Sequence, residues 1–188
     1  IAMPQPVRAL ACVVVLVCFG AGGALAQNNA LYGGIEIGAK GVKGTAIQVL
    51  PETNPQAEGY KIKLLLGESI NTTIMKTRDN RFLPEALKET GQAVQKLYER
   101  MTNELHVPAS QIYLVGSSGV RAANQEDLVN ELKQRTGKTM EFLTVEAEVE
   151  LSIAGAIPQR YRLGRRSYDN RSVSVLLDIG SGNTTRRI

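Results

Sequence analysis

The sequence predicts a mixed α/β domain, and three observations support this prediction. Three strand-like segments follow one another near the beginning, at residues 31–37, 43–50 and 59–67. From residue 84 onward, helical and strand-like segments alternate. Turns that combine an acid with glycines stand at the ends of two predicted strands. Consecutive strands joined by short turns favour antiparallel pairing, and strands joined by helices favour parallel pairing. We therefore expect a mixed sheet with flanking helices.

Residues 1–26 have the pattern of a secretory signal peptide. Arg8 is their only charged residue, residues 9–23 are apolar, and a small-residue cleavage pattern ends at Ala26. Both cysteines of the chain lie in this segment, so cleavage would leave no disulfide and no cysteine ligand. We expect a periplasmic or secreted protein in which residues 27–188 form the mature domain.

The net charge and the histidine content limit the kinds of ligand and partner that we expect. The formal net charge of +4 is compatible with an anionic ligand, but it gives no ground for nucleic-acid binding. The single histidine, His106, leaves a zinc site or a histidine triad without support. We therefore expect no nucleic-acid partner and, after signal cleavage, no membrane contact. A homodimer is compatible with the sequence.

The first part of the mature chain is expected to be an antiparallel meander of the three strands. Residues 68–83 are polar and are expected to be irregular. Pro84 then begins an amphipathic helix whose apolar residues recur at helical spacing as far as Leu105, and Pro108 follows its end.

A β-α-β-α-β pattern is expected next. Residues 112–116 form a strand, and the following helix has Asn124 as its predicted N-cap and Gly137 as its stop signal. Residues 140–144 form a short strand, and a helix spans residues 146–156. A last strand at 173–179 is expected to close the sheet.

The turn at residues 178–183 carries the first chemical signal. Asp178 follows an apolar run, and glycines at positions 180 and 182 allow backbone N–H groups to approach a ligand closely. A carboxylate beside such a turn suits a metal-bound phosphate, although a plain β-hairpin turn is the alternative interpretation. Glu36 likewise stands two residues before Gly38 at the end of a predicted strand. We expect the two turns to face each other across a cleft.

Four motifs together resemble the first domain of the exopolyphosphatase/guanosine-pentaphosphate phosphohydrolase (Ppx/GppA) family. This family belongs to the actin, Hsp70 and sugar kinase superfamily, which has a ribonuclease H-like fold. Its first phosphate loop, Asp-x-Gly-Ser-Asn, is matched by residues 36–40, and its Thr-Ser-Ala-x-Arg turn by residues 117–121. Its Gly-x-Glu-Glu-Ala-x-Leu segment is matched by residues 145–151, and its second phosphate loop, Asp-x-Gly-Gly-Gly-Ser, by residues 178–183.

The resemblance implies that water hydrolyses a terminal phosphoanhydride of polyphosphate or a nucleotide polyphosphate, with Mg²⁺ or Mn²⁺ as the cofactor. Glu148 matches the family's general base, and Glu36 and Asp178 match its metal ligands. The phosphate-binding residues that it implies are Gly38, Lys40, Gly41, Ser117, Ser118, Arg121, Gly180, Ser181, Gly182 and Asn183. Without the resemblance, the glutamates around Glu148 are explained by the helix dipole and by solvent.

Several departures from the family pattern leave the function open. Glu replaces Asp at position 36, and Ala39 and Lys40 replace the usual hydroxyl and amide side chains. The chain ends soon after the second phosphate loop, so we expect a truncated protein that lacks a second domain, with residues 185–188 as an aberrant tail. Two alternatives remain: a non-catalytic phosphate- or nucleotide-binding protein, and an ATP-dependent enzyme similar to sugar kinases.

Overall fold

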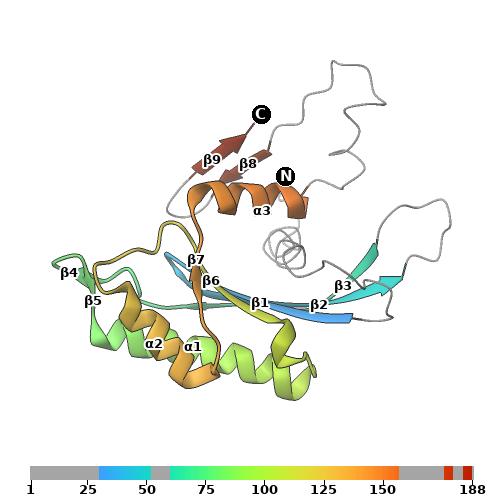
Figure 1. Cartoon of the computed structure of the whole chain (residues 1–188), viewed down its shortest axis with the longest axis horizontal. Helices are drawn as coiled ribbons and strands as arrows, with labels where there is room; N and C mark the ends of the chain where they lie inside the picture. The colour runs from blue at the N-terminus through green and yellow to red at the C-terminus, as the bar shows by residue number, and fades with distance from the viewer. Residues whose placement is uncertain (1–29, 52–59, 157–175, 180–183, 188) are drawn as a thin grey trace, which may run out of the picture.

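The computed structural model describes residues 30–51, 60–156, 176–179 and 184–187. A five-stranded mixed sheet forms the middle layer, with helices α1 and α2 on one side and helix α3 on the other (Figure 1). Among the described residues, no helix combines the length and the apolar character needed to span a bilayer. The predicted α/β class with flanking helices is confirmed.

The antiparallel meander forms as predicted. It consists of β1 (Ala30–Gly38), β2 (Gly41–Pro51) and β3 (Tyr60–Asn71), each antiparallel to the next. The third strand is longer than expected because it continues to Asn71 beside the start of β2. The register of the second pair shifts between Ala46 and Ile47.

A turn between Gly38 and Gly41 joins the first two strands. Gly41 has a φ of +142°, a conformation that side-chain-bearing residues rarely adopt. A Cβ atom at this position would lie 2.2 Å from the carbonyl oxygen of Ile70. Lys40 accepts a hydrogen bond at its carbonyl oxygen from the Thr72 amide, at 3.1 Å. Glycine at position 41 therefore lets the end of β3 pack closely against this turn.

The parallel part of the sheet follows the alternating segment of the sequence. Strand β6 (Ile112–Gly116) lies parallel to β1, and β7 (Glu141–Phe142) lies parallel to β6. The resulting strand order is β3-β2-β1-β6-β7. The predicted combination of an antiparallel meander with parallel strands is confirmed.

Two helices cover one face of this sheet (Figure 1). Helix α1 (Pro84–Glu99) continues into a π-helical turn, Arg100–Glu104, and packs against α2 (Gln125–Thr136). The second helix ends at Gly137, which has the left-handed φ of 70° that its predicted role as a stop signal requires. The core between these layers consists of fully buried apolar side chains, including Ile35, Ile37, Val94, Leu97, Leu128 and Leu132.

Two sequence-based expectations about local structure are wrong. Residues 68–83 are not irregular throughout, because β4 (Thr77–Arg78) and β5 (Arg81–Phe82) form a short hairpin. Its turn residues, Asp79 and Asn80, both have positive φ values, 52° and 56°. This is the backbone of a tight two-residue hairpin turn, which Asp and Asn tolerate better than most residues.

The last strand does not close the five-stranded sheet. Strand β8 (Leu176–Ile179) pairs with β9 (Thr184–Arg187) in a separate two-stranded sheet. Residues 184–187 are therefore a return strand. That the end of the chain is an aberrant tail stays a prediction. A short connection favours antiparallel pairing with the nearest segment, whereas joining a parallel sheet requires a longer crossover. The hairpin lies against α3 (Val145–Ala156) (Figure 1).

Candidate active site

The ends of three parallel strands bring the predicted site segments together. Strands β1, β6 and β7 point the same way, so the residues that follow them lie at one edge of the sheet. Backbone hydrogen bonds fix this edge: the Ser117 amide donates to the Ile37 carbonyl, and the Leu143 amide donates to the Gly116 carbonyl, each at 2.9 Å. Ligands in open α/β sheets bind at the carboxyl ends of such strands.

Helix α3 begins at this edge and carries Glu148 in its first turn. The hydroxyl of Thr144 accepts a hydrogen bond of 3.1 Å from the Ala147 amide and caps the helix. Glu148 is half-buried, and its Oε2 accepts two hydrogen bonds from Ser118. The Ser118 amide donates at 3.1 Å and the Ser118 hydroxyl at 2.5 Å. We call this pair of residues the site clamp.

The turn that contains Ser118 uses most of its amides within the protein. Besides the Ser117 and Ser118 amides, the Val120 amide donates to the Ser117 carbonyl at 3.0 Å. Arg121 extends from the turn with an exposed side chain that donates to two carbonyls. Its Nε lies 3.3 Å from the Ser118 oxygen, and a terminal nitrogen lies 3.4 Å from the Leu143 oxygen. Arg121 thus connects the loops that follow β6 and β7.

Glu36 lies at the end of β1 on the face of the sheet opposite α1. Its neighbours Ile35 and Ile37 are buried in the core with that helix, and side chains alternate along a strand. Lys43 is directly opposite Glu36 in β2, and its Nζ lies 3.6 Å from a carboxylate oxygen. Glu36 is the more buried partner, with 19% of its side chain exposed against 54% for Lys43.

The structure places the predicted site residues in two groups. Six of them lie at the same sheet edge: Glu36, Gly38, Ser117, Ser118, Arg121 and Glu148. Lys40 is exposed on the adjoining β1–β2 turn, and Gly41 is buried there. The positive φ of Gly41 explains why glycine stands at this position. Phosphate binding by Lys40 and Gly41 stays a prediction.

The second phosphate loop falls mostly outside the described residues. Gly180, Ser181, Gly182 and Asn183 all lie outside them, and of Asp178 only the backbone position is described, on β8 opposite Thr185. The hairpin that bears Asp178 lies against α3, the helix that carries Glu148. A facing arrangement of the Glu36 and Asp178 side chains across a cleft stays a prediction.

The described side chains contain a carboxylate suited to a hard cation but no complete protein cage for one. In this part of the chain, no group of three or more His, Cys, Asp or Glu residues gathers as metal ligands. Mg²⁺ is commonly held by one or two carboxylates while its other positions are filled by water and by phosphate oxygens of the substrate. Glu36, at the strand ends, fits that mode of binding.

Sequence reasoning missed one residue that positions the site and the main contact of another residue outside it. Thr144 caps α3, and a threonine before a helical run rich in acids is a signal that could have revealed it. Asn124 was predicted only as a cap. It stands at that position, but its side chain makes no capping bond and pairs with the backbone of Phe82. Its Oδ1 accepts from the Phe82 amide at 2.7 Å, and its Nδ2 donates to the Phe82 carbonyl at 3.3 Å.

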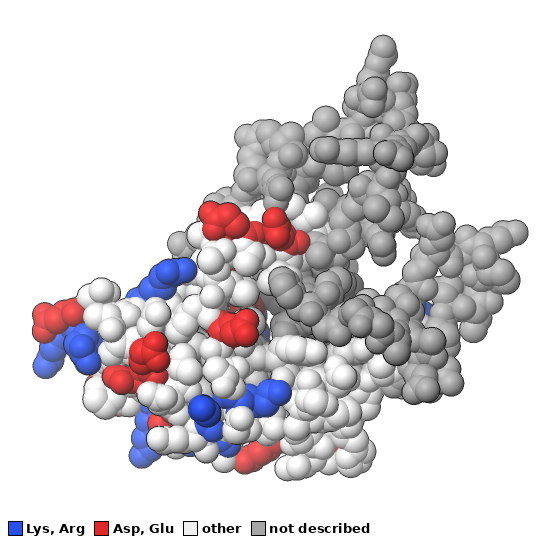
Figure 2. All heavy atoms as spheres, in the orientation of Figure 1, with Lys and Arg blue, Asp and Glu red and all other residues white. Residues whose placement is uncertain are grey.

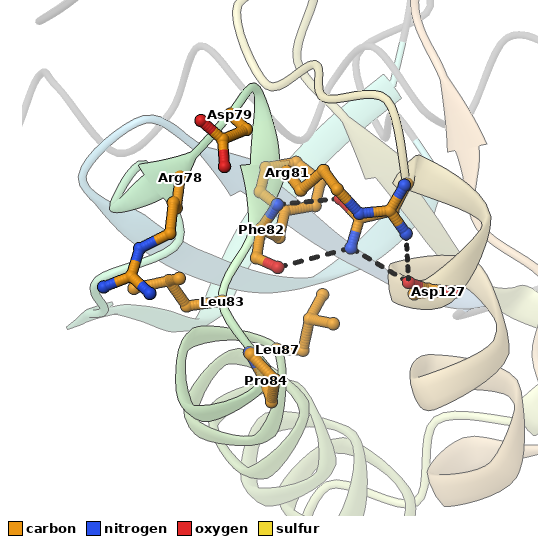
Figure 3. A pocket seen from close by; sticks show the side chains of 9 residues that line it. Arg78, Asp79, Arg81, Phe82, Leu83, Pro84, Leu87 and Asp127 are labelled. Carbon is orange, nitrogen blue, oxygen red and sulfur yellow. Dashed lines mark hydrogen bonds and ion pairs between the residues drawn. The ribbon is translucent and has the colours of Figure 1, made fainter.

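A hollow of about 310 Å³ lies beside Asn124, where the β4–β5 hairpin meets the starts of α1 and α2 (Figure 3). Phe82, Leu83, Pro84 and Leu87 supply much of its lining. A second hollow, of about 380 Å³, lies between α1 and α2. Neither is lined by a predicted site residue, so we do not assign the candidate chemistry to either of them.

The charged side chains of the described surface are mixed in sign. Figure 2 shows acidic side chains over the region of α3, and both signs together near the β4–β5 hairpin. No continuous basic stripe of the kind that binds nucleic acid is visible on this face of the described surface.

The strand order and the helices on both faces of the sheet define an α/β domain. Its candidate site lies at the sheet edge where the parallel strands end. No protein-family model matches the sequence, and no curated protein sequence matches it. Solved structures do match. An exopolyphosphatase-like protein superposes with a TM-score of 0.62 at 20% identity, covering 84% of this chain and 44% of that one.

Two further structures agree. A Ppx/GppA family member from Aquifex aeolicus gives a TM-score of 0.54 at 22% identity and covers 64% of this chain and 37% of its own. An exopolyphosphatase from Cytophaga hutchinsonii gives 0.50 at 16% identity, covering 64% and 36%. This chain thus spans 36–44% of the length of these structures. The predicted likeness of the fold to Ppx/GppA structures is confirmed.

Proposed function

We propose that this chain is a domain of a phosphoanhydride hydrolase that acts on polyphosphate or on a guanosine polyphosphate. The observation that carries the proposal is the position of Glu148. Ser118 orients the Glu148 carboxylate at the sheet edge where the parallel strands end. The exposed Arg121 and the carboxylate of Glu36 lie at the same edge. The likeness of the fold to exopolyphosphatase structures supports the same reading.

In the proposed reaction, Glu148 acts as the general base for an attacking water molecule. The water oxygen forms a bond to the terminal phosphorus while the bond from phosphorus to the bridging oxygen breaks. The electron pair of that bond stays on the shortened phosphate chain, and a proton of the water passes to the Glu148 carboxylate. The protonated carboxyl group then releases this proton to solvent, so that Glu148 returns to its starting state. Base catalysis of this kind contributes about 10²–10⁴-fold to a rate.

Cationic and amide groups at the strand ends would bind the phosphate chain. Arg121 donates to two carbonyls through one terminal nitrogen and Nε, so the exposed guanidinium retains donors for phosphate oxygens. Lys40 adds a charge from the neighbouring turn. Mg²⁺ bound to Glu36, and to Asp178 if its side chain faces the same edge, would offset the negative charge of the phosphates.

The compartment is part of the proposal. Residues 1–26 are proposed to direct export, so the substrate would be a phosphate chain outside the cytoplasm. Separation of the cell fractions, followed by detection of the chain and sequencing of its first residues, tests this. A mature chain that begins near residue 27 in the periplasm or medium would support export, and an intact chain in the cytoplasm would contradict it.

The proposed function is tested with the whole chain, by measuring release of inorganic phosphate from long-chain polyphosphate and from guanosine pentaphosphate. We expect release that requires Mg²⁺ and stops on addition of a chelator. Glu36→Gln should raise the Mg²⁺ concentration needed for half-maximal release, because it removes a charged oxygen ligand.

The two alternatives are separated from the proposal by two further measurements, of binding and of ATP consumption. A non-catalytic binding protein would retain labelled polyphosphate on a filter without releasing phosphate. A kinase similar to sugar kinases would consume ATP only when a sugar is present. If the chain neither binds a phosphate chain nor releases phosphate from it, the proposal is contradicted.

A further inference from the structure

The carboxylate of Glu148 is held at one oxygen only. Both donors of Ser118, its amide and its hydroxyl, converge on Oε2. Among the described residues, Oε1 of Glu148 has no hydrogen-bond donor. The two oxygens of this half-buried group are therefore in different environments, and only Oε1 has both lone pairs available to another molecule.

Ser118 is itself held by the ends of two strands. Its neighbour Ser117 is buried and donates to β1 through the Ile37 carbonyl, and the Ser118 carbonyl accepts from Arg121 at 3.3 Å. The same arginine reaches the loop after β7, which leads into α3. The two donors that fix Glu148 are thus anchored to the sheet, whereas Glu148 stands on the first turn of a helix that follows a strand of two residues.

These contacts lead to an assignment that differs from phosphate binding by Ser118. Its amide and hydroxyl hydrogens are both directed at the Glu148 carboxylate, so binding a phosphate oxygen through either donor would require breaking a bond to Glu148. We propose that Ser118 is a positioning residue, which holds Oε2 of Glu148 so that Oε1 faces the attacking water and receives its proton.

The proposal rests on the proposed function, and it specifies which atom acts as the base. During the reaction one O–H bond of water breaks and one forms at Oε1, while Oε2 keeps both hydrogen bonds to Ser118. A donor pair on Oε2 restricts rotation of the carboxylate. The carboxylate is therefore already oriented toward the water before attack, which lowers the entropic cost of reaching the transition state.

The kinetic test compares three variants in the phosphate-release assay. Ser118→Ala removes the hydroxyl but keeps the amide, and we expect kcat to fall about tenfold with KM changed less than about twofold, the size expected for one hydrogen bond to a charged group. Ser118→Thr keeps the hydroxyl and should restore kcat. Thr73→Ala is the matched control, because Thr73 makes the same two contacts to Glu89. It should leave kcat and KM unchanged.

A rise in KM at constant kcat for Ser118→Ala would overturn the proposal, because it would assign Ser118 to phosphate binding. Failure of Ser118→Thr to restore kcat would also overturn it. A second measurement separates the contact from the reaction: amide hydrogen exchange at Ser118 should become faster in Glu148→Ala and stay unchanged in Glu89→Ala. Unchanged exchange in Glu148→Ala would show that the contact does not exist in solution. Absence of phosphate release by the unmodified chain would instead contradict the proposed function.

Discussion

Two carboxylates in this domain are held by the same pair of contacts, on opposite faces of the sheet. In the site clamp, Ser118 donates its amide and hydroxyl to Glu148 of α3. In a second pair, which we call the loop clamp, Thr73 donates its amide at 2.9 Å and its hydroxyl at 2.5 Å to Glu89 of α1. The loop clamp ties the segment after β3 to a helix that is packed into the core.

The comparison shows that contact geometry alone does not define an active site. Glu89 is fixed as tightly as Glu148, yet it belongs to the layer that packs against the core, and its neighbours are structural ones such as Thr90, which bonds Thr72. Glu148 contacts the turn after β6, which also carries Arg121, at the sheet edge where β1, β6 and β7 end and where Glu36 lies. The position within the fold, and not the pair of contacts, is therefore what makes Glu148 the proposed base.

The largest expected effect is the difference in kcat between variants of Glu148 and of Glu89 in the phosphate-release assay. Glu148→Gln should lower kcat by about 10²–10⁴-fold, since it removes the proton acceptor while keeping the size of the side chain. Glu89→Gln should change kcat less than about twofold. Comparable losses in both variants would mean that the effect arises from folding and would contradict the assignment of Glu148.

The next effect concerns the backbone beside the loop clamp. Gly41→Ala should destabilise the domain by about 1–3 kcal/mol or more, because alanine strains the positive φ and its Cβ would clash with the Ile70 carbonyl. Urea unfolding monitored by circular dichroism measures this. Gly38→Ala is the control, since its Cβ would lie 3.7 Å from a Glu36 oxygen and should leave stability almost unchanged. Equal stability of the two variants would show that the turn relaxes.

The loop clamp should also be visible in the dependence of stability on pH. The hydroxyl and the amide of Thr73 donate to the Glu89 carboxylate and hold the pKa of Glu89 below its usual value of 4.5. Because the unfolded chain then binds this proton at a higher pH than the folded chain, the clamp stabilises the domain above about pH 4.5. This contribution is lost as the pH falls through the lower pKa of the folded state.

Glu89→Gln and Thr73→Ala test this dependence. We expect each variant to be less stable than the unmodified chain at pH 7, with the difference shrinking toward pH 3, as measured by urea unfolding at several pH values. A difference of equal size at pH 7 and pH 3 would indicate that packing, and not the charge of Glu89, accounts for the stability of the loop clamp.

The smallest effect is expected within the site clamp's own turn. Gly119 is exposed, its φ is not positive, and a Cβ added there would meet nothing within 4 Å. Gly119→Ala should therefore change the free energy of unfolding by less than about 1 kcal/mol and leave phosphate release intact. Loss of release with unchanged stability would show that a ligand approaches this backbone closely, and would move phosphate binding into the turn.

Much of the fold was predictable because its signals are local. Alternation predicted the meander, and the left-handed glycine at position 137 ended α2 as expected. The β4–β5 hairpin was missed because its turn is made by Asp79 and Asn80 without a glycine. The pairing of β8 with β9 was missed for another reason, since the partner of a strand depends on chain entropy and edge geometry and not on its own residues.

The candidate site was predictable only in part. Glu148 and Arg121 were predicted as site residues through the family resemblance, and the strand register explains why their segments lie at one edge of the sheet. The bond between Ser118 and Glu148 spans 30 residues, so no periodicity in the sequence reveals it. The resemblance suggested a different task for Ser118, and the structure shows that both of its donors are already engaged by Glu148.

The register shift between Ala46 and Ile47 affects how readily the sheets of two molecules can pair at their edges. Strand β3 is one of the two edge strands of the five-stranded sheet, and an edge strand generally offers unpaired backbone groups to a neighbour. Beyond the irregularity, it exposes Lys61 and Lys63 alongside Ile62 and Leu64. Extra local twist and like charges both oppose edge-to-edge pairing with a strand of another molecule, so we expect the irregularity and the two lysines to disfavour aggregation through β3.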